Sequence, residues 1–70
     1  MIRQPIQSSN LRSVGYDEKL KILEIEFHEG RIYQYSNVPE NIYSNLMNAL
    51  SKGKFFAQQI KNRFPTKRLV

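Results

Sequence analysis

The sequence of 70 residues contains no cysteine and no tryptophan, and it has a single histidine. The absence of cysteine excludes disulfide-bonded folds, cysteine-based zinc sites and thiol catalysis. The longest stretch without a charged residue is 41–51, whereas a membrane-spanning helix needs ~20 mainly apolar residues. The first ten residues are mostly polar and do not resemble a secretory signal. We therefore expect one small cytoplasmic domain without a membrane segment.

Acidic residues are absent from positions 51–70, which contain six Lys or Arg. The first fifty residues carry five bases and six acids, so the entire net charge of +5 lies in the C-terminal part. A basic block of this density attracts phosphates, acidic lipid head groups or an acidic protein surface without choosing among them. The alternative is a solvated helix and tail that bind nothing.

Glycine and proline are scarce, with three of each, and they mark the expected boundaries. Residues 1–9 are polar and lack periodicity, so we expect a flexible N-terminal segment. A single domain is expected over residues 10–66, followed by a basic tail at 67–70. Within it, residues 11–16 predict a short strand, where Gly15 indicates a close backbone approach or a bulge.

Alternating apolar residues over 20–27 predict a second, half-buried strand. Glu29-Gly30 then predicts a tight hairpin and a third strand. A two-residue turn would place Tyr33 opposite Glu26, so that Tyr33 and Tyr35 share the polar face. A three-residue turn with a glycine bulge would place Tyr33 opposite Ile25, so that both tyrosines enter the core. One residue of register thus decides between ligand platforms and packing residues.

Two amphipathic helices are expected after Pro39, which suits a helix start. The first has apolar residues at spacings of three and four up to Leu50. The second is expected over 54–63, with an apolar stripe that ends before Pro65. A separate basic face carries Lys54 and Lys61. Phe55 lies neither on the apolar stripe nor on this basic face, so it either wedges between the helices or stands exposed. The predicted fold class is α+β, with a three-stranded antiparallel β-meander followed by two α-helices packed on one face.

Four motifs occur in order: residues 8–17, 27–30, 33–39 and 53–65. Together they resemble the KTSC domain, named for the C-terminal region of some lysyl-tRNA synthetases and found also as a free-standing bacterial protein. The resemblance covers residues 8–66, and its Tyr-x-Tyr motif maps to Tyr33 and Tyr35. It implies no established activity and no catalytic residues, and it attaches RNA binding only as a suggestion. Glu29 stands where asparagine looks commoner in relatives.

Candidate catalytic groups lack partners in this sequence. His28 at the expected hairpin tip has no cysteine or serine motif to serve. Glu24 and Glu26 are two apart on a strand, where carboxylates usually face solvent. We therefore expect no enzyme activity, no metal site and no cofactor.

Nucleic-acid binding requires cations for phosphates and aromatic faces for unpaired bases. Tyr33 and Tyr35 are the stacking candidates, provided that they face outward. The phosphate-binding candidates are Lys54, Lys61, Arg63, Lys67 and Arg68. We expect a monomer that binds tRNA or single-stranded RNA, and the alternative is a protein-interaction module that docks on an acidic partner.

Overall fold

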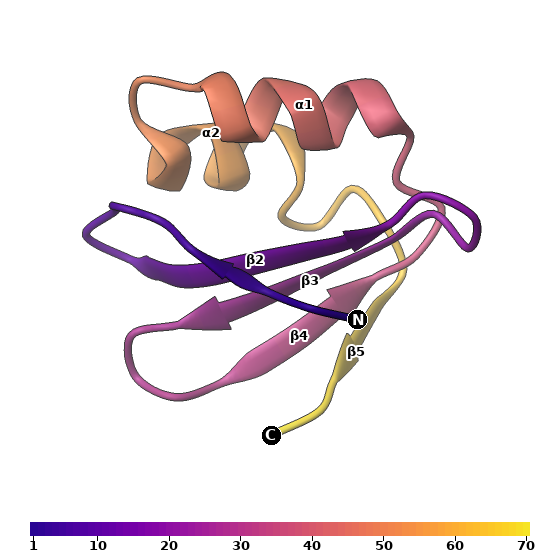
Figure 1. The fold of residues 1–70 in the computed structure, drawn as a ribbon, viewed down its shortest axis with the longest axis horizontal. Coiled ribbons are helices and arrows are strands. Elements are labelled where there is room, and N and C mark those ends of the chain that lie inside the picture. The colour runs from indigo at the N-terminus through magenta and orange to yellow at the C-terminus, as the bar shows by residue number, and fades with distance from the viewer.

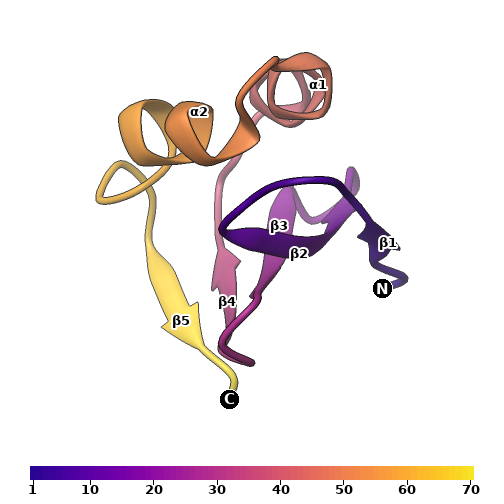
Figure 2. The same ribbon diagram turned by 90° about the vertical axis from the view of Figure 1, so that its left-hand side faces the viewer.

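The computed structural model describes all residues from 1 to 70 and shows a five-stranded antiparallel sheet with two helices over one face (Figure 1). The order of strands in the sheet follows their order in the chain, and both helices lie on the same side of it (Figure 2). Neither helix is long and apolar enough to cross a bilayer. The elements are β1 (Gln4–Pro5), β2 (Leu11–Asp17), β3 (Ile22–Phe27), β4 (Ile32–Tyr35), α1 (Glu40–Asn48), α2 (Lys52–Gln59) and β5 (Thr66–Arg68).

The sheet corrects the predicted three-stranded meander. Strands β2, β3 and β4 form that meander, but β1 pairs with β2 and β5 pairs with β4. The segment 1–9, expected to be flexible, contributes a strand, and the tail expected at 67–70 begins inside another. Edge strands of two and three residues are too short to show an alternating apolar pattern, so the sequence carries no periodic signal for them.

The β3–β4 hairpin adopts the three-residue turn. Leu23 lies opposite Tyr35 and Ile25 lies opposite Tyr33. Gly30 ends the turn with φ of 97°, a conformation that favours glycine. This register confirms the alternative in which both tyrosines lie on the face that the helices cover.

The core lies between that face and the helices. Val38 and Leu46 are completely buried against the sheet, and Phe56 of α2 and Ile60, which follows the end of α2, close the core from the other side. The sheet contributes Leu11, Val14, Leu23, Ile25 and Tyr35.

Both helices are shorter than the apolar spacing predicts. The first ends at Asn48, so Leu50 is fully exposed instead of continuing its stripe. The second spans Lys52–Gln59, where residues 54–63 were expected. The backbone N–H groups of Ile60 and Lys61 both donate to the Phe56 carbonyl, which ends the regular helical pattern. Lys61 therefore lies in the loop after the helix.

The far face of the sheet is partly covered by the N-terminal segment. A Cβ placed on Gly15 would lie 3.0 Å from the Ile2 carbonyl oxygen, which confirms the expected close approach. Arg3 forms an ion pair with Glu24, whose side chain is only 8% exposed. Gln34 Nε2 also donates to Glu24 Oε1 at 2.8 Å. The prediction that Glu24 faces solvent is therefore wrong, because the N-terminal segment was expected to be flexible and not to cover it.

Candidate nucleic-acid interface

Four aromatic rings meet on the helix-covered face of the sheet. The hairpin register brings Phe27 beside Tyr33 with ring centroids 5.8 Å apart. Phe56 reaches down from α2 and packs edge-on against Phe27 at 5.4 Å and against Tyr35 at 5.6 Å. Tyr35 and Phe56 are buried, whereas Phe27 and Tyr33 are half-buried. The cluster therefore joins the core on one side and reaches solvent on the other.

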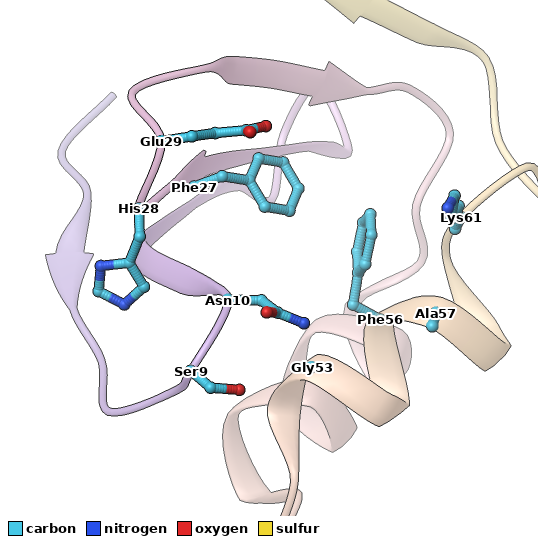
Figure 3. A pocket seen from close by; sticks show the side chains of 9 residues that line it. All are labelled: Ser9, Asn10, Phe27, His28, Glu29, Gly53, Phe56, Ala57 and Lys61. Carbon is cyan, nitrogen blue, oxygen red and sulfur yellow. The ribbon is translucent and has the colours of Figure 1, made fainter.

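Two adjoining hollows, each of about 420 Å³, open over the half-buried side of this cluster. They lie between α2 and the β3–β4 hairpin and share Phe27, Glu29, Phe56 and Lys61. We call the combined depression the aromatic groove. Figure 3 shows one half of it, with Phe27 and Phe56 between Glu29 and Lys61. The half toward the hairpin tip adds Ser9, Asn10, His28, Gly53 and Ala57. The other half adds Arg31, Tyr33, Tyr35, Asn62 and Thr66.

Three cations lie at or beside the aromatic groove. Lys61 lines both halves, and Arg31 lines the half that contains the tyrosines. Arg68 lies directly opposite Tyr33 in the sheet, and cross-strand partners project from the same face. The Nε of Arg68 donates to the Val70 carbonyl at 3.0 Å, and its terminal nitrogens make no other hydrogen bond.

The other predicted phosphate-binding residues lie elsewhere. Lys67 is opposite Gln34, which places it on the far face of the sheet. Lys54 is exposed in the first turn of α2 and does not line the groove. Arg63 donates through Nε to the Gln58 carbonyl at 2.8 Å, which ties it to the end of the helix. The structure thus gathers Tyr33, Tyr35, Lys61 and Arg68 from the seven candidates and separates the remaining three.

The surroundings of Tyr35 make its hydroxyl a weaker acid than that of an exposed tyrosine. Burial, followed by the neighbouring Tyr33, raises the pKa of the Tyr35 hydroxyl to about 12. Its side chain is only 4% exposed, so Tyr35 supports the groove from below while Tyr33 offers accessible ring surface. Within the Tyr-x-Tyr motif, Tyr33 is therefore the residue able to contact a ligand.

Phe55 and His28, which the sequence analysis also considered, make contacts within the domain. Phe55 is half-buried and packs against the core, so it is not the exposed stacking group considered as the alternative. His28 Nε2 lies 2.8 Å from the Ser8 carbonyl oxygen. Figure 3 shows its ring pointing away from Phe27 and Phe56.

Sequence reasoning missed Phe27, Phe56, Glu29 and Arg31 as parts of a site. The two phenylalanines follow the apolar period of their elements, which predicts core residues. A signal was nevertheless present, because the three-residue turn that brings the tyrosines inward also sets Phe27 beside Tyr33.

Comparisons with known proteins show what the whole chain is similar to. The sequence model of the KTSC domain matches residues 7–64. An uncharacterized protein from Stutzerimonas stutzeri is 46% identical over 61 residues, which are 87% of this chain and 86% of that protein. A crystal structure of a KTSC domain protein from Yersinia pestis has 44% sequence identity and a TM-score of 0.93, and covers 99% of this chain and 97% of that one.

Similarity extends to a much larger enzyme. A lysine–tRNA ligase from Nostoc punctiforme is 36% identical over 63 residues. These are 90% of this chain but only 11% of the ligase. The match therefore concerns a small part of that enzyme.

Proposed function

This chain belongs to the KTSC domain family, and from the aromatic groove we propose that it is a non-catalytic module that binds unpaired segments of RNA. The observation that carries the proposal is the pair of half-buried rings, Phe27 and Tyr33, at the floor of a groove flanked by cations. RNA-binding domains recognise unpaired bases by stacking them on such aromatic surfaces.

The charges fit an RNA backbone that crosses the groove. Lys61, Arg31 and Arg68 come from three separate segments and converge on its rim or beside it. Their convergence supports phosphate binding more strongly than the mere density of positive charge in the last twenty residues. Lys54, Arg63 and Lys67 contribute to the surrounding positive field and steer RNA toward the site.

The ligase relative makes tRNA a candidate ligand. A segment similar to this chain accompanies a lysine–tRNA ligase in Nostoc punctiforme. A free-standing domain would act on tRNA in trans, through single-stranded loops or ends where bases are available for stacking.

The first test is binding of a fluorescent single-stranded RNA and of bulk tRNA, followed by anisotropy and by NMR. We expect amide and ring shifts at Phe27, Tyr33 and Lys61. Three phosphate contacts give a slope of about −2 in log affinity against log salt, so affinity should fall about 20-fold between 50 and 200 mM salt.

Lys61→Glu tests the location of the site. It should weaken binding by at least about fivefold, because one phosphate contact becomes a repulsion. Lys19→Glu is the matched control, since it makes the same charge change in the exposed β2–β3 turn at the opposite end of the sheet. Equal affinities for the two variants would move the site away from the groove. An absence of binding to both RNAs at low salt would contradict RNA as the ligand and favour an acidic protein on the same basic surface.

A further inference from the structure

We propose that the aromatic groove selects guanine among unpaired bases and that the Glu29 carboxylate is the selecting group, an inference that rests on the RNA binding proposed above. Glu29 is the acidic residue that lines both halves of the groove. A carboxylate repels phosphates, so its place in an otherwise basic groove favours contact with a base over contact with the backbone.

The Glu29 side chain is positioned to meet a base over the aromatic floor. Figure 3 shows it extending from the hairpin above the Phe27 ring, with its carboxylate directed toward the groove. Its Oε1 accepts a hydrogen bond from Arg31 Nη1 at 3.1 Å. The ion pair orients the carboxylate, and each of its oxygens has a further lone pair for a ligand. The adjoining Gly30, with its positive φ, fixes the turn from which the side chain projects.

The donor pattern of the bases makes this position selective. A carboxylate only accepts hydrogen bonds, through two oxygens that suit a pair of parallel donors. Guanine presents such a pair on its Watson–Crick edge, the N1–H and the 2-amino group. Adenine and cytosine present a ring nitrogen that accepts, and uracil has its N3–H between two carbonyl oxygens. Each of these bases would place an acceptor against a carboxylate oxygen.

A stacked guanine can make this contact without losing the phosphate contacts. The planes of Phe27 and Tyr33 are inclined at 71°, so its ring would stack on the accessible surface of one and meet the other edge-on, while its Watson–Crick edge faces Glu29. Lys61 reaches the groove from the loop after α2 and Arg68 lies opposite Tyr33 in the edge strand β5, whereas Glu29 belongs to the β3–β4 turn. The base and the backbone therefore meet different parts of the rim.

The experiment measures four heptamer RNAs of uridines that differ only in the central base, which is guanine, hypoxanthine, adenine or uracil. A bidentate contact between a side chain and a base discriminates by roughly 5- to 150-fold, and the 58% exposure of the Glu29 side chain favours the lower part of that range. We expect about tenfold tighter binding of the guanine RNA than of the adenine RNA. Hypoxanthine, which keeps the N1–H and lacks the 2-amino group, should be intermediate.

Glu29→Gln should reduce the guanine preference to within about twofold, because an amide offers one acceptor and one donor. The adenine RNA should bind this variant at least as well as it binds the wild type, since a repulsive charge is removed. Glu18→Gln removes the same charge from the exposed β2–β3 turn and should leave the preference unchanged. Release of Arg31 from its ion pair affects all four RNAs alike, so the ratio of affinities is the readout.

Each outcome is decisive. Equal affinities of the wild type for the four RNAs would overturn guanine selection and leave RNA binding intact. If Glu29→Gln keeps the preference, or if Glu18→Gln loses it too, Glu29 is not the selecting group and that part of the proposal is overturned. Failure of every heptamer to bind at low salt would overturn guanine selection together with RNA binding.

Discussion

Replacing Arg3 by methionine should destabilise the domain, and the effect should be partly reversed by a second substitution at Glu24. Methionine keeps much of the apolar stem of arginine and removes the charge. Glu24 would then remain buried, with the hydrogen bond from Gln34 Nε2 at 2.8 Å but without its cation. A buried charge that loses its partner is more costly than a neutral group in the same place.

The expected magnitude follows from the exposure of the two partners. Removing one member of a fully buried ion pair costs about 3–5 kcal/mol. Here the Glu24 side chain is 8% exposed but that of Arg3 is 29% exposed, and Gln34 still donates one hydrogen bond. We therefore expect a loss of about 2 kcal/mol in the free energy of unfolding. For a domain of this size that corresponds to a decrease of roughly 10 °C in Tm.

The discriminating measurement is urea denaturation of the wild type, Arg3→Met, Glu24→Gln and the double variant, followed by circular dichroism. Glu24→Gln leaves Arg3 accessible to water and should cost about 1 kcal/mol. The double variant should be more stable than Arg3→Met alone, because no unpaired buried charge remains. A double variant that is no more stable than Arg3→Met, or an Arg3→Met protein within about 0.5 kcal/mol of the wild type, would refute this reasoning.

Two further predictions concern packing and pH. Gly15→Ala should lower the free energy of unfolding by about 1–2 kcal/mol and release the N-terminal segment, because the new Cβ would lie 3.0 Å from the Ile2 carbonyl oxygen. Faster hydrogen exchange confined to β1 and β2 would verify this prediction, and unchanged exchange would contradict it. The pKa of Tyr35 is raised from 10.0 to about 12, so the unfolded state releases this proton first as the pH rises, and stability should be complete below pH 10 and fall between pH 10 and 12. The loss in the free energy of unfolding attributable to Tyr35 is about 2 kcal/mol by pH 11.5. It is measured by urea denaturation of the wild type and Tyr35→Phe at pH 9 and 11.5. Parallel pH profiles for the two proteins would contradict this prediction.

The sequence predicted the central elements because their apolar residues follow a clear period. Alternation along β3 identified a strand, and the apolar spacing of three and four after Pro39 identified the first helix. The four-residue spacing of Phe56, Ile60 and Phe64 identified the second helix but extended it too far, because α2 ends at Gln59. The edge strands could not be predicted in this way. Their pairing depends on the backbone of β2 and β4, and in two or three residues a side-chain pattern cannot appear. The ion pair of Arg3 with Glu24 depends on the same missed pairing, since β1 must pair with β2 at the edge of the sheet for Arg3, which precedes it, to reach Glu24 on the far face.

In the candidate site, residue type alone does not predict which basic residues lie at the groove. Density of positive charge selected Lys54, Lys61, Arg63, Lys67 and Arg68 together, yet strand pairing and the end of the helix divide them. Lys67 and Arg68 are adjacent in the chain and project from opposite faces of β5. Lys61 reaches the groove because the helix ends before it. A helical projection that continues through Arg63 places Lys61 on the same face as Lys54, which the structure does not support.

The two tyrosines of the Tyr-x-Tyr motif were posed as either core residues or ligand platforms, and the structure places both on the helix-covered face and buries them to different extents. Both project from the same face of β4, so strand register does not distinguish them. The two rings differ in the side chains that cover them. Phe56 packs on Tyr35, whereas Tyr33 contacts Phe27 at the open side of the cluster. Tyr35 therefore belongs to the core that holds the hairpin in place, and Tyr33 belongs to the surface that the hairpin presents. A ligand in the aromatic groove would rest on rings whose positions are fixed by the same packing that stabilises the domain, which keeps the loss of side-chain entropy on binding small.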